Sequence, residues 1–309
     1  MFCHTPVLLK EVVEGLALTR NKNVIDATVG GGGHAWALLQ RIAPAGKLLG
    51  IDADPAAIAA TKERLNAFGD RVALVQARFA PLQPLVDHCM PDVPIHAVLL
   101  DLGVSSFQLT DPSRGFSFQG DAESGLLQAP LDMAFGSRGS EKLPQLLATA
   151  SEEELTQIFR EYGEERNARA ISRQIVRDRR RVPLKTTGQL VETIRQAYRG
   201  AYPKKIHFAT RTFQALRIAV NDELNQLRAV LPEAAHLLQP NGRLAVISFH
   251  SLEDRIVKQF FQRESRDCVC PPEIPECRCE HHARLRVITK KPLTAELEEL
   301  QQNPRARSA

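Results

Sequence analysis

Along the first hundred residues, short apolar runs alternate with helical patterns, and three of the four runs end in an aspartate. The runs cover residues 23–26, 48–52, 72–75 and 95–101. Between them, apolar residues recur at helical spacing, and Asp54-Pro55 supplies an N-cap and a first-turn proline. This alternation is typical of right-handed βαβ units, so it predicts an α/β fold with a parallel sheet.

A run of four glycines, residues 30–33, follows the first apolar run and precedes a helical pattern. Glycine lets the backbone approach a ligand closely, and a helix N-terminus offers N–H groups without partners in the helix. Asp52 ends the next run, where a carboxylate can accept hydrogen bonds from two ribose hydroxyls. These residues predict a site for an adenosine-containing cofactor. Because Gly30, Gly32 and Ala35 also fit the dinucleotide fingerprint, a nicotinamide dehydrogenase stays open.

Asp101 ends the fourth run and leads into a turn sequence. Ligands of open α/β sheets bind outside the carboxyl ends of the strands, where this carboxylate is expected. Methyl transfer to an amine needs the amine lone pair aimed at the methyl carbon, and Asp101 can orient the amine by accepting one of its hydrogens. Asp101 is therefore the catalytic candidate of a methyltransferase, although a carboxylate here can also simply cap the turn.

The pattern changes between residues 110 and 205, where no strand pattern occurs and helical patterns cover 141–150, 152–162, 165–180 and 187–198. We expect a discontinuous α/β domain, residues 1–110 and 205–309, that carries an inserted all-α domain at 111–204.

Arginines recur in this insert, and those at helical spacing can follow a phosphate backbone. Arg173, Arg177 and Arg180, with Arg211 just beyond the insert, are the candidate RNA-binding residues. Acidic residues are interleaved among them, so an ordinary solvated charged face remains the alternative.

After residue 210 the sequence predicts one long amphipathic helix, a fifth strand over 244–248, a helix with Ser251 as N-cap, and a last strand over 285–289. Between the last two lies a Pro-rich segment with Cys268-x-Cys270 and Cys277-x-Cys279. Four cysteines can form a tetrahedral zinc site. The usual two-residue spacer is missing, so metal ligands and free thiols both remain open and the metal is unknown.

Composition narrows the function classes only slightly. The chain has 309 residues, 43% of them hydrophobic and 25% charged, which is typical of a globular protein. Its formal net charge of +4 is too small to demonstrate a nucleic-acid partner. The first residues lack the pattern of a secretory signal, and we expect a cytoplasmic protein with no membrane partner.

With these motifs assembled, the chain resembles the ribosomal RNA small-subunit methyltransferase H family, the bacterial cytosine-N(4) methyltransferases of 16S rRNA. The resemblance extends over nearly the whole chain. It rests on the segments at residues 4–9, 26–34, 52–55, 101–108, 114–118, 209–218, 247–255 and 303–308.

The resemblance implies a class I (Rossmann-like) methyltransferase fold and S-adenosyl-L-methionine as cofactor. The family's cofactor contacts fall on Gly32, Gly33, His34, Asp52, Phe79, Asp101 and Gln108. His4 and His250, in the turn at 248–251, are expected to line the acceptor pocket as further catalytic candidates. The implied partner is 16S rRNA in the assembled small subunit, and a homodimer is retained as a hypothesis.

Overall fold

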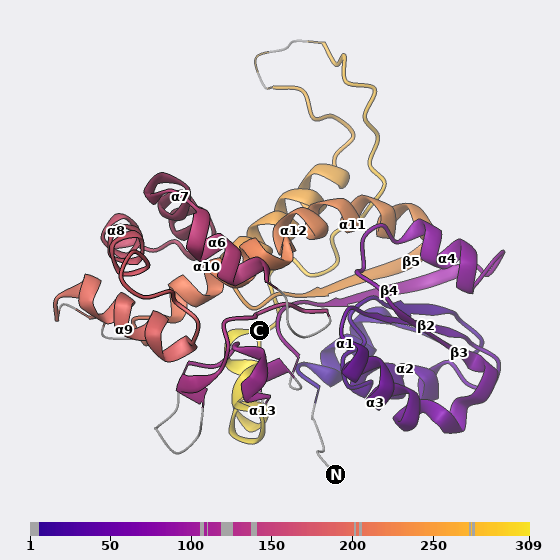
Figure 1. Cartoon of the computed structure of the whole chain (residues 1–309). Helices are drawn as coiled ribbons and strands as arrows, with labels where there is room; N and C mark the ends of the chain where they lie inside the picture. The colour runs from indigo at the N-terminus through magenta and orange to yellow at the C-terminus, as the bar shows by residue number, and fades with distance from the viewer. Residues whose placement is uncertain are drawn as a thin grey trace. The chain divides into compact units, whose positions relative to one another are not determined.

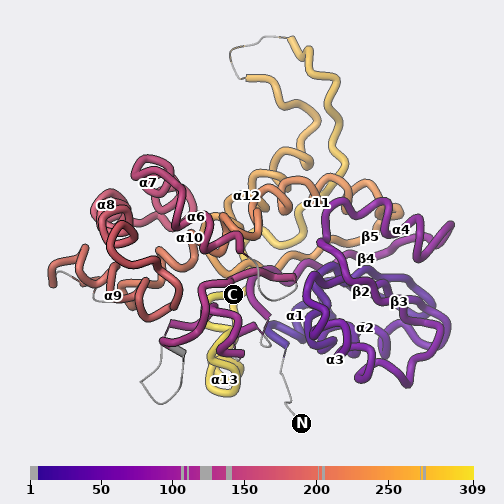
Figure 2. Tube along the Cα trace, in the orientation of Figure 1, coloured from indigo at the N-terminus to yellow at the C-terminus, as the bar shows by residue number. Residues whose placement is uncertain are grey.

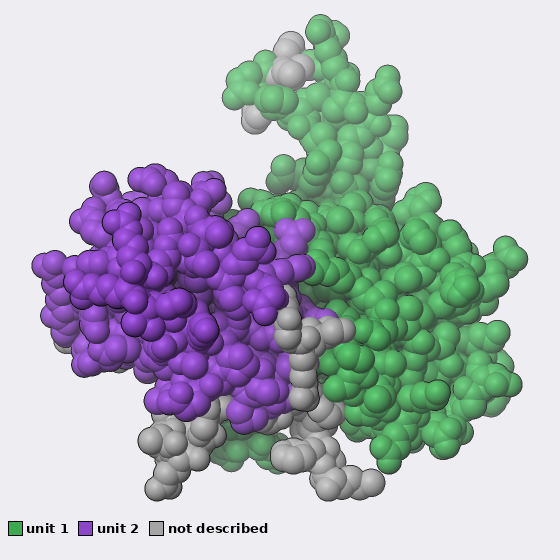
Figure 3. Space-filling model, viewed as in Figure 1, with its two compact units in different colours: residues 1–103, 224–309 green, residues 104–223 purple. Residues whose placement is uncertain are grey.

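The computed structural model describes residues 6–105, 108–109, 111–118, 126–136, 141–200, 202–203, 206–271, 273 and 276–309. The chain divides into two compact units, unit 1 at residues 1–103 and 224–309 and unit 2 at residues 104–223 (Figure 3). Within the described ranges, no helix is both long and apolar enough to cross a membrane.

Unit 1 is built on a five-stranded parallel sheet with the strand order β3-β2-β1-β4-β5 (Figure 1). The strands are β1 (Val24–Asp26), β2 (Leu48–Asp52), β3 (Val72–Gln76), β4 (Ile95–Asp101) and β5 (Leu238–Ile247). The predicted α/β class and the four apolar runs are confirmed. Strand order reverses between β1 and β4, and this switch point is where open α/β sheets bind ligands.

Helices cover both faces of this sheet (Figure 1). One face carries α1 (Leu9–Leu16), α2 (Gly33–Arg41) and α3 (Pro55–Leu65), and the other carries α4 (Gln83–Cys89), α11 (Glu223–Leu237) and α12 (Ser251–Glu264). Buried apolar residues of α1 and α2 pack with β1 and β2 in one core, which Ala306 of the C-terminal segment joins. That segment comprises α13 (Leu297–Gln302) and the short 3-10 helix η4 (Pro304–Ser308). Asp54 caps α3 as predicted, with its carboxylate accepting the Ala56 N–H at 2.9 Å.

Unit 2 is helical, with α6 (Lys142–Thr149), α7 (Glu152–Gly163), α8 (Ala168–Asp178), α9 (Thr187–Tyr198) and α10 (Thr210–Asn221). The described residues also form short 3-10 helices, η1 (Asn66–Arg71) in unit 1, and η2 (Pro112–Arg114) and η3 (Leu126–Gln128) in unit 2. Ser151 and Thr186 begin α7 and α9 with capping boxes. Phe159, Ile171 and Ile175 are fully buried in the core of this unit. The four predicted helices of this region are therefore confirmed.

Three local predictions are wrong. The expected single helix after residue 210 is two helices, because Asp222 adopts a left-handed conformation (φ 55°) that no α-helix continues through. The cap of α12 is His250 instead of Ser251, since the His250 ring accepts the Glu253 N–H. Residues 285–289 form no strand, and the Leu285 N–H instead donates to the Glu264 carbonyl at the end of α12.

Candidate active site

Three aspartates end strands at the same edge of the unit 1 sheet. Asp26 ends β1 and pairs in register with Leu99 of β4 and Gly50 of β2. Asp52 and Asp101 lie two residues further along those neighbouring strands. The parallel register therefore brings three carboxylates to the switch point between β1 and β4.

The glycine turn is fastened to Asp52. The Asp52 carboxylate accepts the Gly30 N–H through Oδ2 at 2.9 Å and the Asp54 N–H through Oδ1 at 2.8 Å. Gly30 and Gly32 adopt positive φ values of 50° and 72°, which favour glycine. Gly32 is the N-cap of α2 and, as a glycine, supplies no side-chain cap to this helix end. The first N–H groups of α2 are thus available for an anion at the sheet edge.

Gly33 lies against the ring of Pro6. A Cβ at Gly33 would lie 2.4 Å from Pro6 Cγ, far inside van der Waals contact. Glycine is therefore required here by the close approach of the N-terminal segment, independently of any ligand.

We predict that Gly33→Ala destabilises the protein by about 1–3 kcal/mol, because the added methyl forces Pro6 and its segment aside. Urea unfolding of the full chain measures the change in the free energy of unfolding. The matched control is Gly15→Ala in α1, where nothing lies within 4 Å of the added Cβ. This control should gain about 0.5–1 kcal/mol from helix propensity. Equal stability of Gly33→Ala and wild type would show that Pro6 does not occupy this position.

The strand-end cluster holds buried polar atoms that lack hydrogen-bond partners among the described residues. They are Asp26 Oδ2, Asp101 Oδ1 and both ring nitrogens of His34. Such atoms are costly to leave unsatisfied, so their concentration at the switch point indicates a ligand site.

The pKa values of the cluster reflect burial among like charges. Burial raises the pKa of Asp26 to about 7. Attraction to His34 opposes this rise in pKa, and repulsion from Asp101 and Asp52 adds to it. Burial also raises the pKa of Asp52 to about 6, although its backbone hydrogen bonds oppose the change. For His34, burial disfavours the charged ring, but the carboxylates of Asp101 and Asp26 outweigh it and the pKa is raised. A cationic ligand group would relieve this accumulation of negative charge.

Asp101 is held by a hydrogen bond to Thr28, and its carboxylate lies near the His34 ring. Its backbone N–H donates to Thr28 Oγ1 at 2.6 Å, and its Oδ2 lies 3.6 Å from His34 Nε2. The chain then turns at Gly103 (φ 96°), where an added Cβ would lie 3.3 Å from the ring of Phe249 in the turn after β5. The Thr28 hydrogen bond thus fixes the backbone position from which the Asp101 carboxylate projects. The Oδ1 atom of this carboxylate has no hydrogen-bond partner among the described residues.

The other predicted unit 1 residues have different surroundings. His4 lies outside the described residues. Phe79 is half-buried in the segment after β3, which begins with Ala77 donating its N–H to the Asp52 carbonyl at 2.9 Å. The His250 ring is engaged by Glu253, whose Oε1 lies 3.1 Å from Nε2. The ring of His250 therefore fixes the start of α12.

Gln108 belongs to unit 2, where it is 3% exposed. Its Oε1 accepts the Ser105 N–H at 3.0 Å, and its Nε2 donates to the Phe135 carbonyl at 3.3 Å. Arg114, also buried, donates to the carbonyls of Ala134 and Gly136 at 2.6 and 3.0 Å. These two side chains organise the loop at 131–136 within unit 2.

The candidate RNA-binding arginines of α8 share one helix face. Arg169, Arg173 and Arg177 follow one another on α8 at helical spacing, Arg180 lies two residues past the end of this helix, and all four are exposed; they are called the α8 arginine stripe below. The Oε1 atom of Glu152 lies 3.8 Å from Arg169 Nε and 3.4 Å from Arg173 Nη2. Exposed ion pairs of this kind contribute little free energy, so the arginines of the stripe can exchange Glu152 for another anionic partner. Arg211 instead donates to the Glu164 carbonyl at 3.0 Å, beyond the end of α7.

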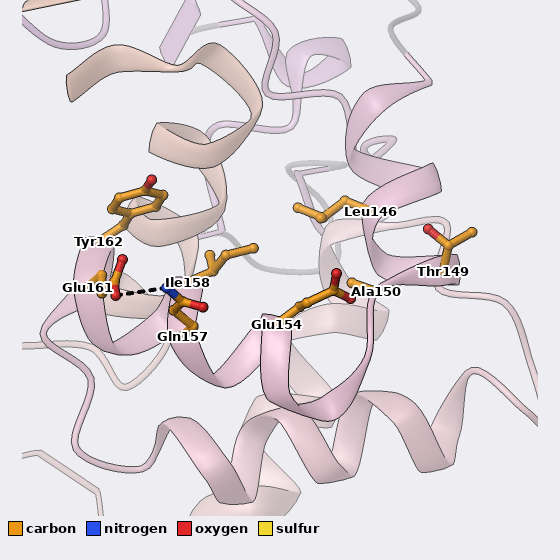
Figure 4. Close-up of a pocket in the computed structure, with 8 residues that line it drawn as sticks. All are labelled: Leu146, Thr149, Ala150, Glu154, Gln157, Ile158, Glu161 and Tyr162. Carbon is orange, nitrogen blue, oxygen red and sulfur yellow. Dashed lines mark hydrogen bonds between the residues drawn. The ribbon is translucent and has the colours of Figure 1, made fainter. Parts of the chain in front are cut away.

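A hollow on unit 2, between α6 and α7, does not suit RNA (Figure 4). It is lined by Leu146, Thr149, Ala150, Glu154, Gln157, Ile158, Glu161 and Tyr162. Glu154 and Glu161 give it acidic character, and Gln157 donates to Glu161 at 3.0 Å. Negative charge of this kind repels phosphate.

Two residues of the cluster, Asp26 and Thr28, are not among the site residues predicted from the sequence. The signal for Asp26 was present, because it ends its strand just as Asp52 and Asp101 do. Thr28 gave no such signal, since only the fold places its hydroxyl beside the Asp101 N–H.

The 3-2-1-4-5 parallel sheet, the uncapped helix N-terminus after β1 and the acid at the end of β2 together define a nucleotide-cofactor-binding α/β protein. The chain belongs to the MraW methylase family, whose model matches residues 1–309. Membership in a methylase family sets the nicotinamide dehydrogenase aside.

Proteins called ribosomal RNA small subunit methyltransferase H are similar over the full length. The protein from Heliobacterium modesticaldum is 48% identical in sequence, and the match covers 100% of this chain and 97% of that protein. That from Thermomicrobium roseum is 47% identical, over 99% of this chain and 91% of its own. A solved SAM-dependent methyltransferase from Geobacter sulfurreducens is 14% identical over 72% of this chain and 89% of its own, with a TM-score of 0.25 that supports no structural conclusion.

Proposed function

We propose that the protein transfers a methyl group from S-adenosylmethionine to the exocyclic amine, N(4), of a cytidine in the decoding region of 16S rRNA, on the assembled small subunit. The observation that carries the proposal is the cluster of unsatisfied buried polar atoms at the switch point of the sheet. Family membership and the names of the full-length relatives support the reaction and the RNA substrate.

The residues of the cluster fit this cofactor chemically. Asp52 uses one lone pair of each oxygen for a backbone N–H, so each oxygen can accept a further bond from a ribose hydroxyl. Asp26 and Asp101 offer buried carboxylate oxygens suited to an ammonium group, and the N-terminus of α2 suits a carboxylate. When bound, S-adenosylmethionine supplies a methyl group already activated on a sulfonium.

Asp101 is then the residue that orients the acceptor. An amine attacking an activated methyl needs alignment more than acid or base chemistry. The Asp101 carboxylate can accept one amine hydrogen, which directs the nitrogen lone pair, and Thr28 fixes the backbone from which that carboxylate projects.

RNA recognition is assigned to the α8 arginine stripe. Its exposed guanidinium groups can contact successive phosphates, and Arg173 and Arg177 are 63% and 61% exposed. The acidic hollow between α6 and α7 offers no comparable surface.

We predict that replacing Arg173, Arg177 and Arg180 with alanine weakens binding to small subunits and leaves binding of S-adenosylmethionine unchanged. The slope of log affinity against log salt should fall by about 0.7–0.9 for each phosphate that the variant no longer neutralises. Filter binding over a salt series measures this slope. Arg195→Ala is the control, because this exposed arginine of α9 is paired with Glu192 at 2.7 Å. An unchanged slope in the triple variant would remove the stripe from RNA recognition.

The reaction itself is tested on small subunits from cells that lack the protein. These are incubated with the purified chain and methyl-labelled S-adenosylmethionine, and the 16S rRNA is digested to nucleosides. Label in N(4)-methylated cytidine is expected. Tight particle binding without label in RNA would instead favour a non-catalytic assembly factor, and label in another nucleoside would overturn the assigned acceptor.

A further inference from the structure

The segment after α12 leaves the body of unit 1 and returns to it (Figures 1 and 2). Both ends are fastened at the end of α12. The Arg284 and Leu285 N–H groups donate to the Glu264 carbonyl at 2.8 and 3.0 Å, and the Ala283 N–H donates to Asp267 Oδ1 at 3.1 Å. We call residues 266–285 the cysteine loop.

The described residues of the cysteine loop form no apolar core of their own. None of its described residues is buried. A segment of this length without a core needs another source of order, which in small modules is commonly a disulfide or a metal ion.

Four thiols gather in this loop. The Sγ atoms of Cys268, Cys270, Cys277 and Cys279 all lie within 4.8 Å of one another. Cys277 and Cys279 are 3.6 Å apart, and Cys279 and Cys268 are 3.8 Å apart. These separations exceed a disulfide bond length of about 2.05 Å, and all four cysteines are free thiols.

The separations match the edges of one metal-centred tetrahedron. Zinc binds thiolates at about 2.3 Å, which places two sulfurs of a tetrahedral site about 3.8 Å apart. Backbone N–H groups also point at the sulfurs: Val269 donates to Cys279, Cys270 to Cys268 and Arg278 to Cys270, each at 3.4 Å. Such bonds stabilise thiolate charge, as the hydrogen bonds to metal-bound thiolates do.

We infer that Cys268, Cys270, Cys277 and Cys279 bind one structural zinc ion that orders the cysteine loop. Four protein ligands close the coordination sphere, which is the arrangement of structural zinc. His281 is not a ligand, because its Nε2 lies 3.1 Å from the Arg263 carbonyl, where it joins the loop to α12. The one-residue spacing, which by itself leaves metal and free thiols both open, is accommodated because the two Cys-x-Cys segments face each other.

The first test is the metal content of the full chain, purified without a metal-binding tag under reducing conditions. Mass spectrometry should find one zinc per chain in wild type and none above background in the Cys268→Ser, Cys277→Ser double variant. Cys89→Ser, which alters a half-buried cysteine outside the loop, should retain the zinc. Retention of zinc by the double variant would overturn the assignment, and so would iron in place of zinc.

A second measurement requires no variant. Wild-type chain stripped by a chelator and titrated with Co²⁺ should develop the visible absorption of a tetrahedral thiolate site, which stoichiometric Zn²⁺ then abolishes. Trypsin should cleave after Arg278 in the stripped chain and not in the zinc-loaded chain, since metal binding orders the segment. Absence of the cobalt spectrum, or equal cleavage of both forms, would contradict the inference whatever the enzyme's activity.

Discussion

Asp101→Ala is expected to reduce methyl transfer by about a hundredfold or more at saturating S-adenosylmethionine, because small misplacements of a reacting group cost rate on this scale. The alanine removes the carboxylate at the end of β4. The hydrogen bond from the backbone N–H of residue 101 to Thr28 Oγ1 remains. Single-turnover labelling of small subunits measures the rate.

Asp87→Ala is the matched control for this variant. Asp87 is an exposed aspartate of α4, and its carboxylate accepts a local bond from Gln83, one turn earlier in the same helix, at 2.8 Å. Its turnover should equal that of wild type. Wild-type turnover in Asp101→Ala as well would remove this carboxylate from the mechanism.

Asp26→Asn should have opposite effects on binding and on stability. Loss of a charge-assisted hydrogen bond weakens cofactor binding by about 1.5–3 kcal/mol, which corresponds to a tenfold or greater rise in Kd. The protein without cofactor should become more stable at pH 8, because a buried carboxylate that resists ionisation is replaced by a neutral amide. Since the pKa of Asp26 rises from 3.8 to about 7, the gain in the free energy of unfolding has an upper bound of about 4 kcal/mol.

The pH dependence gives this prediction its sign. The folded carboxyl of Asp26 binds its proton more tightly than the unfolded one, so its contribution to wild-type stability falls as pH rises from about 4 to about 7. The gain of Asp26→Asn should therefore be largest at pH 8 and vanish near pH 4. Calorimetric titration at pH 8 measures the Kd, and thermal unfolding across this pH range measures stability. Lower stability of the variant than of wild type at pH 8 would contradict the raised pKa.

Much of the fold was predictable because its signals are local. The apolar runs of β1 to β4, the Asp54 cap and the helices α6 to α9 of unit 2 all follow from residues within one element. The wrong predictions have causes that no local sequence pattern shows. Asp222 breaks a helix through its own backbone conformation, and residues 285–289 are drawn to the end of α12 instead of joining the sheet.

The candidate site follows the same division. The glycine turn, Asp52 and Asp101 could be found because strand ends are visible in the sequence. The tie between Thr28 and the Asp101 backbone could not, since these residues meet only through the pairing of β1 with β4. The converging thiols of the cysteine loop likewise needed three-dimensional distances, because the spacing alone left metal ligands and free thiols both open.

The most direct test of the donor site is a crystal structure of the full chain soaked with S-adenosylhomocysteine, the product form of the cofactor. We expect the ribose against Asp52, and the amino acid end at the N-terminus of α2 beside Asp26. Well-ordered ligand elsewhere on the protein, with nothing bound beside the turn at Gly30 to His34, would contradict the assignment of this sheet edge as the methyl-donor site.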